Sequence, residues 1–109
     1  MQDMFGKRLE AGDFILYGGS KMIKYGIILQ IRTMYSKGYP DGYPEIVVRG
    51  GSFENGEARL HSNSSVIVNI PQIVKVPVDF FPEWMFNELI KVFEDYEPTV
   101  KPGERKKRR

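Results

Sequence analysis

Alternation of hydrophobic and polar residues marks the first part of the chain and predicts strands. The run from Phe14 to Tyr17 is aromatic or branched and is followed by glycines, which predicts a strand and a turn. Between Ile23 and Arg32 every second residue is apolar, the pattern of a strand that is buried on one face. Gly26 in the middle of this run predicts a bulge or a bend.

The middle of the chain mixes strand patterns with turn residues. Residues 32–44 hold two prolines and two glycines, so we expect a long loop there rather than a strand. Residues 45–49 predict a third strand that stops at Gly50-Gly51. A fourth strand is predicted over 57–61, with its two apolar side chains facing inward.

Two apolar runs complete the predicted sheet. They cover Val66 to Ile70 and Ile73 to Val76, and Pro71-Gln72 lies between them. A proline cannot donate a hydrogen bond to a sheet ladder. We therefore expect the chain to turn at this point and to re-enter the sheet in a new direction.

The apolar spacing becomes helical after residue 81. The apolar stripe recurs every three or four residues and comprises Met85, Phe86, Leu89, Ile90 and Phe93. Pro82 suits a first helical turn and Pro98 forbids extension, which predicts a helix over 82–96. Such a helix cannot bury its stripe alone, so it should close one open end or face of the sheet. Near the N-terminus, Phe5 and Leu9 lie four apart and predict one short helical turn.

This arrangement of elements resembles a known class of small barrel. Five short strands, a long loop between strands and a proline turn between the last two are similar to the barrel of the Src-homology-3 type, which includes KOW and Tudor modules. The residues that carry the resemblance are Gly12-Asp13-Phe14-Ile15-Leu16-Tyr17 and Val66 to Val76. It covers about residues 13–76, and it implies a five-stranded barrel, capped here by one C-terminal helix, that binds nucleic acid or a protein segment. A barrel, a helix and a basic end are also typical of small accessory proteins of phages and bacteria.

Length and composition indicate one globular domain. The chain has 109 residues, of which 41% are hydrophobic and 28% charged. We predict a single domain over 1–97 and a disordered basic tail over 98–109. No segment approaches the roughly 18 apolar residues of a membrane span, the first residues lack a signal-peptide pattern, and there is no cysteine. These features predict a cytoplasmic protein.

The net charge of +2 is unevenly distributed. Residues 1–100 hold 10 Lys/Arg against 13 Asp/Glu, which gives −3, whereas residues 101–109 hold 6 against 1, which gives +5. The tail ends in Arg105, Lys106, Lys107, Arg108 and Arg109. Each of these cations can neutralise a phosphate, so the tail predicts salt-dependent contact with DNA or RNA. A solubilising tail and a nuclear-import signal are the alternatives.

The predicted loop at 32–44 is the second candidate binding element. Tyr35, Tyr39 and Tyr43 are spaced four apart, with Arg32 and Lys37 among them. Aromatic rings can stack on unpaired bases while neighbouring cations hold the backbone, and tyrosines also anchor protein interfaces. The same rings could instead fold back to cover the core.

Catalytic and metal-binding patterns are not found in the sequence. His61 is the only histidine, and the serines that follow it at 62, 64 and 65 lack the surroundings of a nucleophile elbow. One histidine without cysteine gives no metal-ligand spacing. We therefore predict no enzyme activity, no cofactor and no metal.

Two functions remain open. The first is a nucleic-acid-binding accessory or regulatory protein, and the alternative is a protein-interaction module that regulates or inhibits a larger machine. Because the body carries −3, phosphate binding would require its basic residues to cluster on one face. A scattered placement would favour the protein-interaction module; the residues concerned are Lys21, Lys24, Arg32, Lys37 and Arg49.

Overall fold

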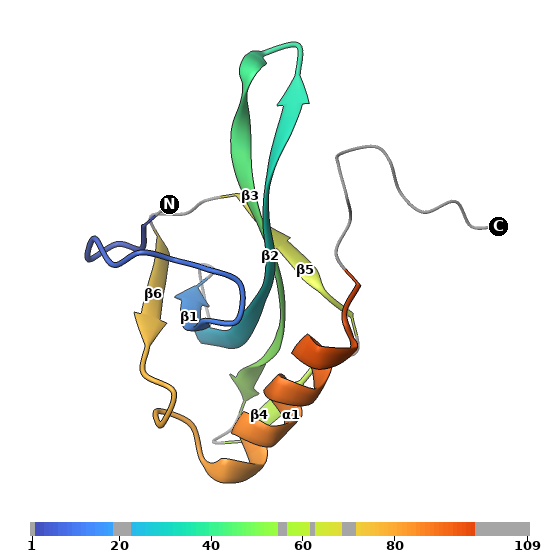
Figure 1. Cartoon of the computed structure of the whole chain (residues 1–109). Helices are drawn as coiled ribbons and strands as arrows, with labels where there is room; N and C mark the ends of the chain where they lie inside the picture. Colours follow the sequence, from blue (N-terminus) through green and yellow to red (C-terminus); the bar gives the residue numbers. More distant parts are fainter. Residues whose placement is uncertain (1, 19–22, 55–56, 62, 69–71, 98–109) are drawn as a thin grey trace, which may run out of the picture.

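A computed structural model shows six strands and one helix in the part of the chain that it describes (Figure 1). It describes residues 2–18, 23–54, 57–61, 63–68 and 72–97. The strands are β1 (Phe14–Gly18), β2 (Ile23–Ser36), β3 (Tyr39–Glu54), β4 (Glu57–Leu60), β5 (Ser65–Ile67) and β6 (Ile73–Val76). The helix is α1 (Glu83–Asp95). The mainly β architecture is thus confirmed, and the basic tail lies outside the described residues.

The sheet is antiparallel and open. Its strand order is β4-β3-β2-β1-β6, and β5 pairs with β3 beside β4. Among the described residues neither β4 nor β5 pairs with β6, so the expected closed barrel of five strands is wrong in strand number and in closure. β5 covers only three residues and pairs with β3, whereas β6 pairs with β1. After β5 the chain re-enters the sheet at its opposite edge, where β6 pairs with β1, and the turn predicted at Pro71 lies outside the described residues.

The central strand β2 is buried on both faces. Residues 25–29 are all buried, and Tyr25, Ile27 and Leu29 face a cluster that α1 covers. Ile28 belongs to a second cluster on the other face, together with Leu9, Ile15, Ile46, Val48 and Ile73. The expectation of a half-buried strand is therefore wrong, because the chain before β1 covers the face that alternation assigned to water. The bulge lies at Leu29, between paired residues 28 and 30, rather than at Gly26.

Helix α1 packs on the sheet as its apolar stripe predicts. Met85 and Leu89 are buried, and the rest of the stripe is partly buried against the same cluster. Phe14 on β1 meets the rings of Phe81 and Phe86 edge-on, at centroid distances of 5.7 and 5.4 Å. The helix thus closes one face of the sheet, within one residue of the expected bounds at each end.

Residues 32–44 form a hairpin instead of the expected loop. β2 runs to Ser36, Lys37-Gly38 makes a two-residue turn, and β3 begins at Tyr39. Prolines are tolerated because each strand of a two-stranded ribbon has one edge without a partner strand, where no N–H is required. The expected end of the third strand at Gly50-Gly51 is also wrong. A Cβ at Gly50 would collide with the Tyr25 carbonyl oxygen. Glycine at this position therefore allows β2 and β3 to approach each other closely.

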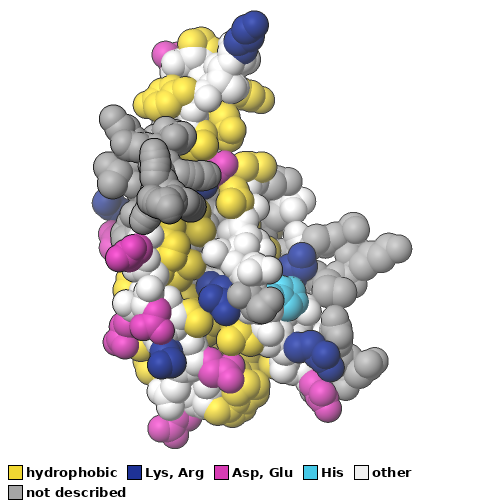
Figure 2. Space-filling model, turned by 90° about the vertical axis from the view of Figure 1, so that its right-hand side faces the viewer, with side chains coloured by type: hydrophobic (Ala, Val, Ile, Leu, Met, Phe, Trp, Pro, Cys, Tyr) yellow, Lys and Arg dark blue, Asp and Glu magenta, His cyan; other side chains and the backbone are white. Residues whose placement is uncertain are grey.

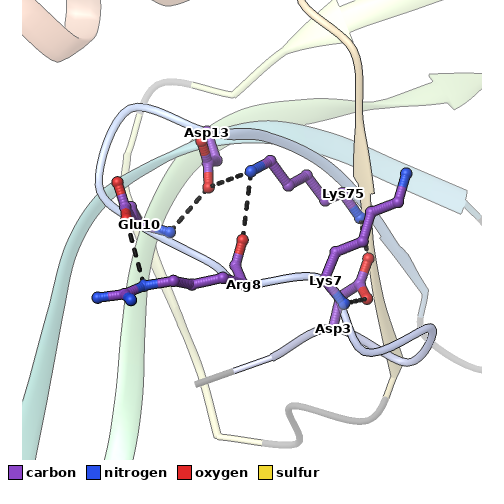
Figure 3. Close-up of polar contacts among 6 residues, drawn as sticks. All are labelled: Asp3, Lys7, Arg8, Glu10, Asp13 and Lys75. Carbon is purple, nitrogen blue, oxygen red and sulfur yellow. Dashed lines mark hydrogen bonds and ion pairs between the residues drawn. The ribbon is translucent and has the colours of Figure 1, made fainter.

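Asp3 anchors the N-terminal segment on β6. Its carboxylate accepts backbone N–H bonds from Phe5, Lys7 and Lys75 at 2.7 to 2.8 Å. Figure 3 shows Asp3 with Lys7 and Lys75. The Lys75 ammonium in turn lies 3.3 Å from the Asp13 carboxylate. The helical turn expected at Phe5 is wrong, because residues 2 to 8 form a turn closed by a bridge between Gln2 and Arg8.

Candidate functional site

The hairpin at residues 31–45 projects from the body and is the main candidate site. We call it the arm; it comprises the end of β2, the turn Lys37-Gly38 and the start of β3. Figure 1 shows it extending alone beyond the packed elements. The three tyrosines that the sequence predicts as site residues all lie on this arm. They are on strands instead of in a loop.

The three predicted tyrosines divide between the two faces of the arm. Tyr39 and Tyr43 are in contact, with ring centroids 5.1 Å apart. They share a face with Met34, because Met34 pairs with Tyr43 and Ser36 with Tyr39. Tyr35 points to the other face. The side chains of Tyr35 and Tyr39 are 62% and 57% exposed, so these rings do not fold back onto the core.

Gly42 allows the two strands of the arm to approach each other closely. Its φ is +90°, and a Cβ at this position would lie 2.9 Å from Cε1 of Tyr35. The Cβ would also collide with the Thr33 side chain. The glycine therefore fixes where the Tyr35 ring lies on the arm surface.

The cations predicted to bind phosphate do not form one cluster among the described residues. Arg32 donates to the Glu45 carboxylate at 2.7 Å at the base of the arm. Lys37 is in the turn, five residues further along the hairpin, which corresponds to about 17 Å of extended strand. The described part of the arm therefore has no concentrated positive charge.

Two further basic candidates lie on the body. Lys24 is near the start of β2, and Arg49 donates from its Nε to the His61 carbonyl at 3.0 Å. Lys21 and the tail residues Arg105 to Arg109 lie outside the described residues. The described candidates Lys24, Arg32, Lys37 and Arg49 are thus distributed between the arm and the body.

His61 has a serine partner that the sequence analysis did not predict. Its Nε2 lies 3.2 Å from the Ser52 hydroxyl oxygen. Ser52 is 1% exposed, so its hydroxyl is closed to a substrate. The contact joins β3 to the residue that follows β4, and we interpret it as a structural hydrogen bond.

Further exposed apolar side chains lie near the start of α1 and at the ends of β2 and β3. They are Ile23, Phe53, Val78, Phe80 and Trp84, which are 39 to 67% exposed, and we refer to them together as the patch. The rings of Phe80 and Phe53 connect through Phe81 and Tyr25, with centroid distances of 5.1 to 5.6 Å. Phe80 is 48% exposed, whereas its neighbour Phe81 is buried.

The patch and the arm lie at opposite ends of the molecule. The arm projects at one end, and α1 starts at the other (Figure 1). Figure 2 likewise shows hydrophobic side chains at the projecting end and again at the far end, with charges of both signs between them. Tyrosines of the arm and Trp84 therefore cannot belong to one compact interface.

Other kinds of site are not formed by the described residues. No three histidine, cysteine, aspartate or glutamate side chains in the described ranges gather to hold a metal ion. Within the same ranges, no helix is long and apolar enough to cross a membrane. A cavity of about 220 Å³ opens beside β5, and its lining combines aliphatic residues such as Val66 and Ile73 with Tyr17, Lys24 and Gln72.

Comparison with known proteins gives no relative from which a function could be transferred. No model of a protein family, no curated protein and no solved structure matches the chain.

Proposed function

We propose that this protein is a non-enzymatic protein-interaction module that docks on a larger assembly through its arm and regulates it. The observation that carries the proposal is the exposure of Tyr35 and Tyr39 on a hairpin that projects from the body. Tyrosine buries a large area with little loss of conformational entropy and is enriched among the residues that dominate interface energies.

Electrostatics support a protein partner over nucleic acid. Phosphate recognition requires cations that converge on one surface. On the arm, Arg32 is compensated by Glu45, and Lys37 is accompanied by Asp41. The residues before the tail are acidic overall, with 13 Asp/Glu against 10 Lys/Arg.

The sequence features agree with this role. Binding a protein segment is one of the two functions that the resemblance to Src-homology-3-type modules implies. The composition has no cysteine, which suits a reducing compartment, and we place the activity in the cytoplasm. An accessory protein of a phage or bacterium is the setting in which this combination of elements is typical.

Direct titration of a purified partner tests the proposal. The partner is first captured from cells that produce the chain, then purified and titrated against wild type and a Tyr35→Ala/Tyr39→Ala variant. We expect the double variant to bind at least about tenfold more weakly, because interface tyrosines are frequent hot spots. Phe5→Ala is the matched control, since Phe5 is an aromatic residue that is 71% exposed outside the arm.

A nucleic-acid assay supplies the result that would overturn the proposal. Wild type, the double tyrosine variant and a chain ending at residue 100 are titrated with double-stranded DNA, single-stranded DNA and RNA over a salt series. Partner binding should survive the truncation. Nucleic-acid binding near physiological salt that both the truncation and the tyrosine substitutions weaken would instead establish the nucleic-acid function.

A further inference from the structure

One edge of the arm lacks a neighbouring strand. On the edge of β2 that faces away from β3, β1 pairs only as far as Ile27. The next backbone partners are Gly12 and Asp13, which exchange hydrogen bonds with Ile28. From Ile31 to Ser36, no described strand pairs with this edge.

Pro44 determines which backbone groups of β2 point toward that edge. Thr33 pairs with Pro44 across the arm, and proline has no N–H to donate. Thr33 and Pro44 therefore form one of the pairs without hydrogen bonds that alternate along an antiparallel ladder. The N–H and C=O of Thr33 consequently point away from β3, and so do those of Ile31 two residues earlier.

The opposite edge of the arm is closed to strand addition. Pro40 and Pro44 lie on β3 and lack N–H groups, and Gly42 between them departs from strand geometry with its φ of +90°. Prolines and irregular residues at an edge are the features by which proteins prevent such pairing. The edge of β2 from Ile31 to Ser36 contains neither proline nor glycine.

We propose that the β2 edge of the arm binds a second copy of this chain by antiparallel strand pairing about a two-fold axis at Met34. In this register Met34 faces Met34 of the second copy, and Thr33 faces its Tyr35. Aromatic and β-branched residues make favourable cross-strand pairs. Arg32 faces a serine and Lys37 an isoleucine, so no two like charges are opposed. This self-complementarity is the reason for choosing a second copy over an unrelated strand.

The structure also restricts the possible registers. Outward-pointing groups repeat every second residue, so the axis can pass only through a residue and not between two. An axis at Thr33 would place the turn Lys37-Gly38 of one copy beside Ile28 of the other, where Gly12 and Asp13 already bind. An axis at Met34 moves the turn outward by two residues and avoids this contact.

The pairing goes beyond the proposed partner binding and does not depend on it. Two arms would form a four-stranded ribbon, which compensates for the marginal stability of a lone hairpin in water. Met34 of each copy would continue the apolar face of Tyr39 and Tyr43 across the axis. Because only about six residues of each chain pair, we expect a weak and concentration-dependent dimer.

Cysteine cross-linking tests the register. The chain contains no cysteine, so each variant carries one thiol. Met34→Cys should form a disulfide-linked dimer, because directly opposed strand residues lie within disulfide reach. Lys37→Cys is the control, since two such thiols would be about 20 Å apart in this register. We expect dimer from Met34→Cys to form at least about tenfold faster under mild oxidation.

A proline substitution tests the edge itself. Thr33→Pro removes an outward N–H without removing a hydrogen bond within the arm, so the variant should fold normally and be monomeric. Analytical ultracentrifugation of the full chain from micromolar to millimolar concentration measures the oligomeric state. Circular dichroism of the variant measures whether it is folded. A wild-type chain that stays monomeric, a dimer that Thr33→Pro leaves intact, or equal cross-linking at residues 34 and 37 would each overturn the proposal. None of these results bears on binding of a different protein by the arm.

Discussion

At the scale of single residues, Asp3 shows how one carboxylate can hold a chain terminus. Burial raises the pKa of Asp3, but backbone N–H bonds from Lys75, Lys7 and Phe5, together with the positive charge of Lys7, bring the pKa below the ordinary value of 3.8. The charged carboxylate is thus the form that the folded state prefers. Its hydrogen bonds join the N-terminal segment to β6, 72 residues away in the sequence.

The lowered pKa of Asp3 predicts a pH dependence of stability. A carboxyl group whose pKa is lower in the folded state contributes stability that is complete above the unfolded pKa. That contribution is lost as the pH falls through the lowered folded pKa. Asp3→Asn should reduce the free energy of unfolding at neutral pH by about 1–3 kcal/mol, and should flatten its dependence on pH below 4. Urea unfolding at several pH values measures both effects, and equal slopes for the two proteins would contradict the assignment.

Two tyrosines allow a matched test of buried hydroxyl groups. The hydroxyl of Tyr25 is buried without a hydrogen-bond partner among the described residues, and burial, followed by the nearby Glu88 carboxylate, raises its pKa. The hydroxyl of Tyr96 instead donates to Oε1 of Gln30 at 2.6 Å. Removing an unsatisfied group should stabilise the fold, whereas removing a bonded one should destabilise it.

We therefore expect opposite effects from the same substitution. Tyr25→Phe should raise the free energy of unfolding by up to about 1 kcal/mol, and Tyr96→Phe should lower it by about 1 kcal/mol. Thermal and urea unfolding give both values. A clear loss of stability in Tyr25→Phe would mean that its hydroxyl has a partner after all.

At the scale of elements, the geometry of the arm depends on Gly42. Alanine at this position combines an unfavourable positive φ with collisions against Thr33 and Tyr35. Gly42→Ala should destabilise the hairpin locally by about 1–3 kcal/mol while the body stays folded. Amide hydrogen exchange should accelerate at Arg32 and Met34 and remain slow at Ile27.

Gly6→Ala is the control for this prediction. Gly6 has a similar φ of +83°, but its Cβ would meet nothing within 4 Å, and it lies in the N-terminal turn. Exchange on the arm should be unchanged in this variant. Unaltered exchange in Gly42→Ala would show that the arm does not require a glycine there.

Elements with a clear internal period were predictable, and those that depend on distant partners were not. The helix stripe and β1 carry their own signals, and both were placed within a residue or two. The arm was missed because prolines and glycines argue against a strand, although a two-stranded ribbon leaves one edge of each strand free. Similarly, Gly50 marks the close approach of Tyr25, a neighbour that is not evident from the local sequence.

The candidate site was predictable in identity but not in arrangement. Tyr35, Tyr39 and Lys37 were named from sequence and are exposed. Their distribution over two faces follows from the strand pairing, and the compensation of Arg32 by Glu45 requires the register of β2 and β3. The patch around Trp84 was missed in part, because Ile23 and Phe53 come from strand ends that are far away in the sequence.

At the scale of the whole molecule, the packed body carries exposed aromatic residues at two opposite ends. Contiguous exposed apolar surface on a small protein commonly marks a contact with another macromolecule. The arm has the greater reach, and its own charges are largely balanced. These properties are the reason for proposing the arm, and not the patch around Trp84, as the main contact with a partner.

Site-specific photocross-linking from the arm is the most direct test of this account. A photoreactive phenylalanine analogue replaces Tyr39, or Asn87 on the exposed face of α1 as a control, in cells that produce the chain. We predict a nuclease-resistant adduct with a different protein from position 39 and not from position 87. A nuclease-sensitive adduct, an adduct with a second copy alone, or identical adducts from both positions would contradict the claim that the arm binds a protein partner.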